Sequence, residues 1–147
     1  MAPIVNSVEI LRRPEDVFSY VTDPVHLPEW QERVVSARAE GPVGVGCRVV
    51  VTRKVGRMER SMTAEMAELN PPREWRIHGL DGPIRGDVDG SIEPLGEGDR
   101  SRVRIALDLK GYGIGKLLLP LLVRRQAESE MPQNMQNLKG LLESEAP

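Results

Sequence analysis

Hydrophobic and polar residues alternate with a period of two along much of residues 4–109, which is the pattern of β-strands with one buried face. The expected strands are 4–11, 34–40, 47–55, 58–69, 75–79, 84–94 and 103–109. Turns containing glycine, proline or asparagine separate most of them. Consecutive strands at hairpin spacing predict an antiparallel sheet of about six to seven strands with one face exposed to water.

Two short helices are expected directly after the first strand. Pro14, followed by two acidic residues, is typical of a first helical turn. This helix should end before Pro24, because the residue that precedes a proline is disfavoured in the α conformation. A second short helix is predicted for residues 26–33.

Residues 115–144 have the helical period and are predicted to form one long C-terminal helix. Its apolar stripe comprises Leu117, Leu121, Met131, Met135, Leu138 and Leu142. Pro120 and Pro132 are expected to break this helix. The sequence therefore predicts a single α+β domain over residues 1–147, in which a twisted antiparallel sheet wraps around the long helix and leaves an apolar pocket between them.

Composition excludes several classes of function. The chain has 20 basic and 22 acidic residues without a basic block, so nucleic-acid binding is not expected. One cysteine and two histidines make a metal site implausible, and the glycines of residues 41–46 do not lead a strand into a helix, so no cofactor is expected.

The chain is also expected to stay out of the membrane. Its first residues have no charged leader and no apolar core of a signal peptide, so we expect a cytoplasmic protein. The apolar stretch 117–123 is much shorter than the ~20 residues that span a bilayer, so no stable membrane insertion is expected. Residues 117–125 remain an alternative membrane-touching segment.

Three short motifs carry a family resemblance: D-P-x-H-L-P-E-W at 23–30, L-N-P-P-R-E-W at 69–75 and N-L-K-G-L-L-E at 137–143. Together with the order of elements, they resemble the polyketide cyclase/dehydrase branch of the START-like (SRPBCC) superfamily. That resemblance covers nearly the whole chain and implies the helix-grip fold. It also implies a deep cavity between sheet and helix for a small hydrophobic or aromatic ligand.

The inward-facing apolar residues are the candidates for lining this cavity. They are Trp30, Met62, Met66, Trp75, Ile77, Val88, Ile105, Leu107, Leu121, Met131 and Met135. The alternative for each is that it fills a core, and Trp30 is equally consistent with an anchor at the edge of that core. Gly86 and Gly90 favour a cavity, because missing side chains on an inward face leave space.

Arg124 and Glu128 are the only candidate polar or catalytic residues. At 100° per residue both point within the apolar stripe of the long helix, one turn apart, where they would bind a ligand carbonyl or phenolate. The alternative is that the two prolines change the phase of the helix and turn the pair to solvent.

The function expected from these features is the binding or transport of a small hydrophobic ligand, such as a polyketide, lipid or isoprenoid. The alternative is a polyketide aromatase/cyclase or dehydratase that works mainly by positioning its substrate. Aromatic residues are only 3% of the chain, and the inward positions of 58–69 read as Met and Ala, whereas such enzymes place an arginine there. A protein-interaction module, including a possible homodimer through a sheet edge or the helix, is a third possibility.

Overall fold

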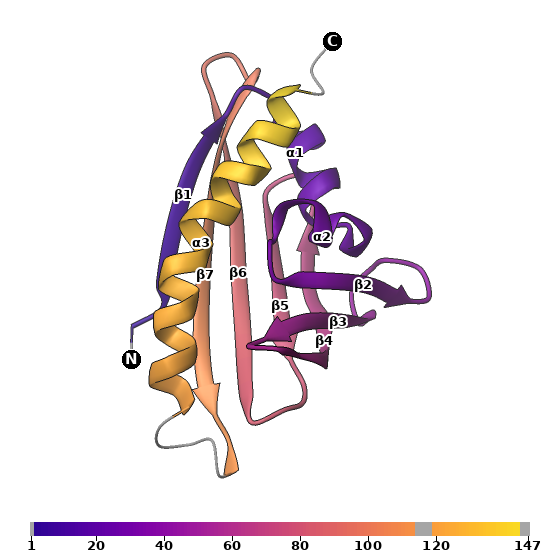
Figure 1. The fold of residues 1–147 in the computed structure, drawn as a ribbon. Helices are drawn as coiled ribbons and strands as arrows, with labels where there is room; N and C mark the ends of the chain where they lie inside the picture. The colour runs from indigo at the N-terminus through magenta and orange to yellow at the C-terminus, as the bar shows by residue number, and fades with distance from the viewer. Residues whose placement is uncertain (1, 114–118, 145–147) are drawn as a thin grey trace.

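The computed structural model describes residues 2–113 and 119–144, and it shows the predicted order of elements (Figure 1). In chain order these are β1 (Ile4–Ile10), α1 (Pro14–Val21), the 3-10 turn η1 (Pro24–His26), α2 (Leu27–Trp30), β2 (Val34–Glu40), β3 (Arg48–Val55), β4 (Met58–Asn70), β5 (Glu74–Gly79), β6 (Ile84–Leu95), β7 (Arg100–Gly111) and α3 (Leu119–Ser144). The predicted α+β class, the two short helices and the long C-terminal helix are confirmed.

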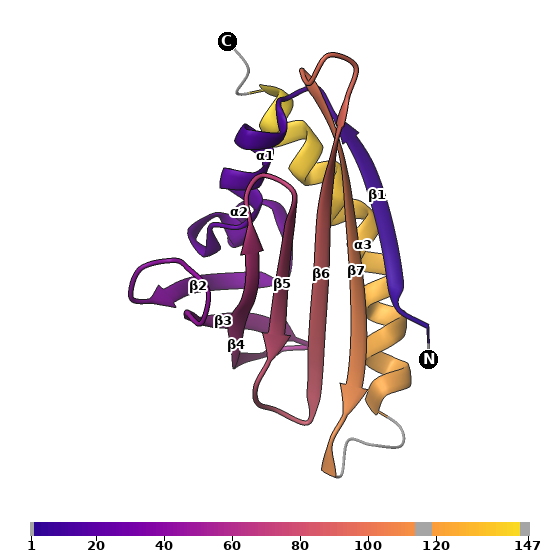
Figure 2. The same ribbon diagram turned by 180° about the vertical axis from the view of Figure 1, so that it is seen from behind.

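The seven strands form one antiparallel sheet in the order β1-β7-β6-β5-β4-β3-β2. Strands β2 to β7 are joined as successive hairpins, and β1 pairs with β7 at the far edge. The sheet bends so that β2 and β3 run across the direction of the long strands β6 and β7, while the second part of β4 runs beside β5, and α3 lies against one face (Figure 1). The view from behind shows the opposite face of β5, β6 and β7 without a covering helix (Figure 2). We call the face that carries α3 the inner face and the opposite one the outer face.

The core occupies one end of the inner face. There the C-terminal half of α3 packs with α1, β1 and β7, and Leu138 and Val103 are both fully buried. Phe18 of α1 contacts Trp75 of β5 edge to face, with 6.0 Å between the ring centroids. Apolar burial of this kind is worth about 1.5–3 kcal/mol for each side chain, so this end of the molecule determines the stability of the fold.

The expected break in the long helix is wrong, since α3 continues through Pro132 as one helix. Pro120 is the second residue of α3, where its missing N–H would have no partner within the helix in any case. Beyond Pro132 the helix is held by Met135, Leu138 and Leu142, which are all buried. The side-chain packing there outweighs the single backbone hydrogen bond that Pro132 cannot make.

The first part of the predicted apolar stripe does not reach the core. Leu121 is 55% exposed, and Leu117 lies outside the described residues. No helix in the part of the chain that the structure describes is both long and apolar enough to cross a membrane.

Candidate functional site

A row of apolar side chains crosses the inner face from β4 to β7. Strand register aligns Met66 with Ile77, Ile77 with Val88, and Val88 with Leu107. Met66 is buried, but Ile77, Val88 and Leu107 are only half-buried although they face the side of the sheet that α3 covers. Apolar surface therefore remains partly uncovered on the inner face, at the border of the packed core.

The predicted lining residues divide into three groups by exposure. Five are buried, namely Trp30, Met66, Trp75, Ile105 and Met135. Five are half-buried, namely Met62, Ile77, Val88, Leu107 and Met131. The remaining one, Leu121 of α3, is 55% exposed. The half-buried group leaves part of its apolar surface exposed.

Gly90 does not provide the space expected from its missing side chain. The indole ring of Trp75 lies over it, and a Cβ at Gly90 would be 2.1 Å from the ring atoms. The gap is thus filled by the neighbouring strand. At Gly86 a Cβ would be 3.0 Å from the terminal Cδ1 of Leu107, so a flexible side chain borders that position.

Arg124 and Glu128 form an ion pair, but it lies away from the inner face. Arg124 Nε is 2.9 Å from Glu128 Oε1, and Arg124 Nη1 donates to the carbonyl of Ala2 at 2.7 Å. The Glu128 side chain is 50% exposed. Because α3 runs beside β1, this side of the helix meets the start of the chain and the solvent. Glu128 is therefore turned toward solvent, whereas the Arg124 side chain is only 22% exposed and lies against the start of the chain.

A second charged cluster, which the sequence did not indicate, joins α3 to the strands. Glu130 of α3 is only 8% exposed; its Oε1 accepts from Arg53 Nη2 at 2.8 Å, and its Oε2 lies 3.6 Å from Arg33 Nε. Asn134 Nδ2 also donates to Glu130, at 3.2 Å. With its amide oxygen turned toward Arg33, Gln126 accepts from the same guanidinium at 2.6–3.1 Å. Two arginines thus surround one buried carboxylate.

Strand register places a third arginine beside this cluster. Arg60 of β4 lies directly opposite Arg53 of β3. The hydroxyls of the adjacent residues Thr52 and Ser61 bond to each other on the outer face, so Arg53 and Arg60 both belong to the inner face. The inward positions of β4 are therefore not only Met and Ala, as the sequence interpretation had it. They include Arg60, between Met58 and Met62.

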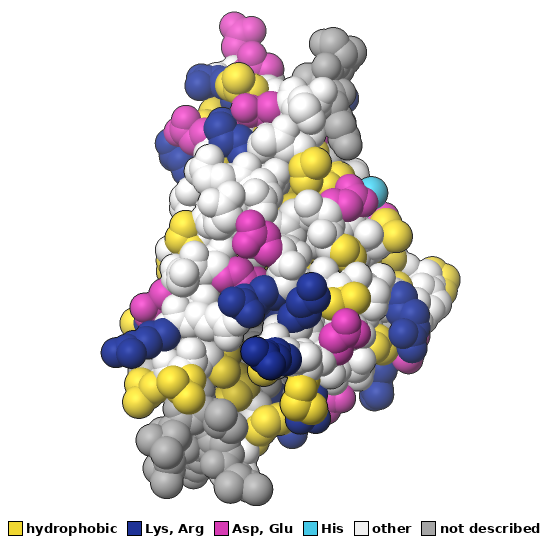
Figure 3. Space-filling model, viewed as in Figure 1, with side chains coloured by type: hydrophobic (Ala, Val, Ile, Leu, Met, Phe, Trp, Pro, Cys, Tyr) yellow, Lys and Arg dark blue, Asp and Glu magenta, His cyan; other side chains and the backbone are white. Residues whose placement is uncertain are grey.

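Basic side chains gather in the middle of the α3 side of the molecule, next to hydrophobic ones (Figure 3). The alternation of Val51 with Arg53, and of Arg60 with Met62, could have indicated this in the sequence. The ion pair between Arg53 and Glu130 could not be predicted from the sequence, because it depends on where α3 crosses the bent sheet.

Trp30 has a polar atom without a partner. Its Nε1 is buried and finds no hydrogen-bond acceptor among the described residues. The Trp30 backbone carbonyl accepts from Asn137 of α3, which fixes the end of α2 against that helix. An unpaired buried N–H costs about 1–3 kcal/mol, so an acceptor from a ligand or a water would be favourable there.

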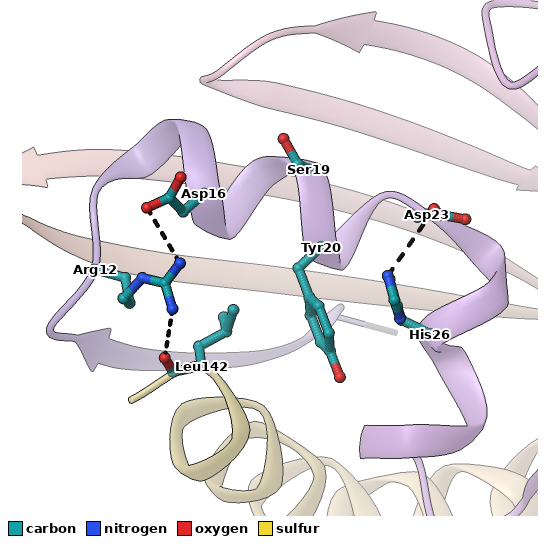
Figure 4. Close-up of a pocket in the computed structure, with 7 residues that line it drawn as sticks. All are labelled: Arg12, Asp16, Ser19, Tyr20, Asp23, His26 and Leu142. Atoms are coloured by element: carbon teal, nitrogen blue, oxygen red, sulfur yellow. Dashed lines mark hydrogen bonds and ion pairs between the residues drawn. The ribbon is translucent and has the colours of Figure 1, made fainter. Parts of the chain in front are cut away.

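A separate surface pocket of about 330 Å³ lies between α1, the residues that follow it and the end of α3 (Figure 4). It is lined by Arg12, Asp16, Ser19, Tyr20, Asp23, His26 and Leu142. Its charged groups are engaged with one another: Arg12 binds Asp16 at 3.2 Å and the Leu142 carbonyl at 2.9 Å. This polar pocket is not the apolar site that the sequence predicts.

Neither histidine faces the inner apolar surface. His26 stacks on Tyr20 with 4.3 Å between centroids, and its Nδ1 is 2.9 Å from Glu29 Oε2. Hydrogen bonds from His26 and from the Tyr20 hydroxyl lower the pKa of Glu29 below its ordinary value. His78 pairs with Asp87 on the outer face. Among residues 2–113 and 119–144, no group of three or more His, Cys, Asp or Glu is placed to hold a metal ion.

The comparisons with known proteins agree on one architecture. A family model described as polyketide cyclase/dehydrase and lipid transport matches residues 1–143. No curated protein sequence matches the chain. Among solved structures, a START superfamily protein from Mycobacterium smegmatis superposes with a TM-score of 0.81 at 14% identity, covering 99% of this chain and 100% of that one.

Two further structures extend the comparison. The protein TTHA0849 from Thermus thermophilus superposes with a TM-score of 0.80 at 18% identity, covering 99% of both chains. The di-domain ARO/CYC BexL from the BE-7585A biosynthetic pathway has a TM-score of 0.75 at 14% identity, covering 95% of this chain and 46% of that one. At these identities the structural matches show the shared fold.

Proposed function

This chain belongs to the polyketide cyclase/dehydrase and lipid transport family, and on that premise we propose that it binds a small hydrophobic ligand on the inner face of its sheet. The observation that carries the proposal is the half-buried row of Ile77, Val88 and Leu107, which the protein leaves partly uncovered. Covering the rest of each such side chain contributes on the order of 1 kcal/mol to binding.

Met62 and Met131 border this row from β4 and α3. Methionine side chains are flexible and polarisable, so they adapt to ligands of different shape. Together the five half-buried residues form a site that is apolar, adjustable and bordered by arginines at one end. These properties suit a polyketide, lipid or isoprenoid carrier.

The alternative function is polyketide cyclisation or dehydration, and the arginines favour it in one respect. Arg53 and Arg60 face the inner side, where a guanidinium can bind carbonyl oxygens of a substrate. Against it, both histidines lie elsewhere, so neither is placed to transfer protons at this surface. Binding thus has the stronger support.

The test is to fill the proposed site and measure what is lost. The neutral apolar dye N-phenyl-1-naphthylamine is titrated into the protein and its fluorescence followed. Val88→Phe should weaken dye binding by at least about tenfold, because the ring occupies the uncovered surface. The matched control is Val50→Phe, a half-buried valine on the outer face of β3, which should bind the dye as the wild type does.

Equal dye binding by Val88→Phe and wild type, with both folded by circular dichroism, would show that the inner face is not the site. The enzyme alternative is tested with a poly-β-ketone thioester and analysis of the products by mass spectrometry. Accelerated ring closure or loss of water, absent in Val88→Phe, would replace the carrier assignment with a catalytic one.

A further inference from the structure

Arg53 and Arg60 form a like-charged pair directly across two neighbouring strands. Their Cα positions are partners in the β3–β4 register, and both side chains project from the inner face. Like charges that lie directly opposite destabilise a sheet. An anion bound between the two guanidinium groups would remove this electrostatic repulsion.

Only one of these arginines has an anionic partner within the protein. Arg53 bonds to Glu130, whereas Arg60 Nη2 lies 4.0 Å from the sulfur of Met58, and no carboxylate of the described residues is within ion-pair distance of Arg60. Arg33 also pairs with Glu130, so two arginines contact this carboxylate and Arg60 is a third arginine beside them. The cluster carries an excess of two positive charges in a chain whose net charge is −2.

The apolar surface begins next to this cluster. Met62 is the next inward position after Arg60 on β4, and it lies opposite Val51, the inward neighbour of Arg53. From Arg60 to Met66 the strand extends roughly 20 Å at about 3.3 Å per residue. A long acyl or polyketide chain spans such a distance, with one end at the arginines and the other at the packed core.

We propose that the ligand is an amphiphile with an anionic head group, a carboxylate or a phosphate, bound between Arg53 and Arg60 at the edge of the inner face. This assignment rests on the proposed function, because the apolar body of the ligand lies on the same half-buried row. Guanidinium groups bind both kinds of anion through paired, charge-assisted hydrogen bonds. Glu130 holds Arg53 in place and leaves Arg60 for the head group.

Three probes of equal chain length separate the head group from the chain: dodecanoate, dodecyl phosphate and the neutral alcohol dodecanol. Each is titrated against the protein loaded with N-phenyl-1-naphthylamine, and displacement of the dye is measured. Dodecanoate or dodecyl phosphate should bind about tenfold or more tightly than dodecanol. The difference between the two anions identifies the preferred head group.

Arg60→Gln is the decisive variant. Because Arg60 has no ion pair with the described residues, the variant should keep the melting temperature of the wild type or exceed it. It should lower the affinity for the anionic probes by about tenfold and leave dodecanol binding unchanged. The matched control is Arg76→Gln on the outer face of β5, which makes the same change in net charge and should alter none of the affinities.

Each of the other outcomes is decisive. Equal binding of dodecanoate, dodecyl phosphate and dodecanol by the wild type would overturn the anionic head group while the apolar site stands. Equal weakening of all three probes by Arg60→Gln would show that Arg60 acts only on the shape of the site, which also overturns the assignment. Failure of every probe to displace a dye that does bind would reject an alkyl amphiphile, and failure of the dye itself to bind would reject the apolar site.

Discussion

Individual side chains decide how much of the inner face is filled. Trp75 lies over Gly90 and meets Phe18, so one aromatic ring closes the packed end of the sheet. Leu107 leans over Gly86 but stays half-buried. The boundary between the packed core and the proposed ligand surface therefore runs between Trp75 and Leu107, which lie on the inner face two strands apart.

Gly90→Ala should be strongly destabilising. The new Cβ would be 2.1 Å from the Trp75 indole, which packs in the core and cannot move away without leaving a void. We expect a loss of roughly 2–4 kcal/mol in the free energy of unfolding, measured by chemical denaturation. An unchanged denaturation midpoint would show that Trp75 does not occupy this place.

Gly140→Ala provides the opposite case within the same protein. Gly140 is inside α3, and nothing lies within 4 Å of the Cβ it would acquire. Alanine should stabilise the helix by about 0.5–1 kcal/mol, because it removes the backbone entropy that glycine loses on folding. The same denaturation experiment measures this gain, and a loss would mean that the helix surface at Gly140 is in contact with another part of the chain.

At the scale of elements, the position of α3 on the sheet depends on two polar attachments. Near the middle of the helix, Glu130 binds Arg53 of β3 and Arg33 before β2. Near its end, Glu143 accepts from the backbone N–H of Leu11 at 2.9 Å and pairs with Lys139 at 2.7 Å. The first attachment borders the proposed ligand site and the second lies beyond the packed core.

Glu130→Gln should weaken the first attachment. The carboxylate is almost fully buried between two guanidinium groups, so its replacement by a neutral amide leaves both cations without a counter-charge. We expect a loss of about 1.5–3 kcal/mol in the free energy of unfolding. Glu128→Gln is the control, because that half-exposed carboxylate pairs with Arg124 on the same helix and should cost less than about 1 kcal/mol. Equal effects of the two variants would contradict the role given to Glu130.

The second attachment should depend on pH. The hydrogen bond from Lys139, with a further one from the backbone of Leu11, lowers the pKa of Glu143 from 4.5 in the folded protein. A carboxyl with a lower pKa in the folded state stabilises it fully above pH 4.5, and that stabilisation is lost as the pH falls below 4.5 through the folded-state pKa. The free-energy difference between wild type and Glu143→Gln should therefore be constant near neutral pH and shrink below pH 4.5. Denaturation curves at several pH values measure it, and a difference that grows on acidification would contradict the attachment.

At the scale of the whole molecule, the proposed ligand binding would be linked to folding. The half-buried inner face belongs to the folded sheet only, so a ligand that covers it stabilises the folded state. At a ligand concentration a hundred times the dissociation constant, the gain is about 2.7 kcal/mol. For a domain of this size we expect the melting temperature to rise by roughly 8–10 °C.

Differential scanning fluorimetry with dodecanoate would measure this shift. Val88→Phe should lose it, whereas Val50→Phe on the outer face should keep it. A shift of equal size in both variants would place the ligand outside the inner face.

Much of the architecture followed from the sequence alone. Alternation over β2 to β7 and the helical period of α3 depend on neighbouring residues, and so the strands, the helices and their order were predicted correctly. The same local periods predicted that Ile77, Val88 and Met131 face inward. Periodicity also placed Leu121 in the apolar stripe. Leu121 is nevertheless 55% exposed, because only the C-terminal half of α3 packs in the core.

The tertiary structure alone decided how these faces meet. Glu130 finds Arg53 across 77 positions of the chain, and Trp75 fills the place beside Gly90 from another strand. These contacts depend on where α3 crosses the bent sheet and on the register between strands, which no local period encodes. The sequence by itself thus determined which residues face inward. Only the folded chain decided which of them are buried, which stay partly exposed, and which arginines lie beside them. The physical reason is that periodicity is local, whereas burial and ion pairing depend on distances between segments far apart in the chain.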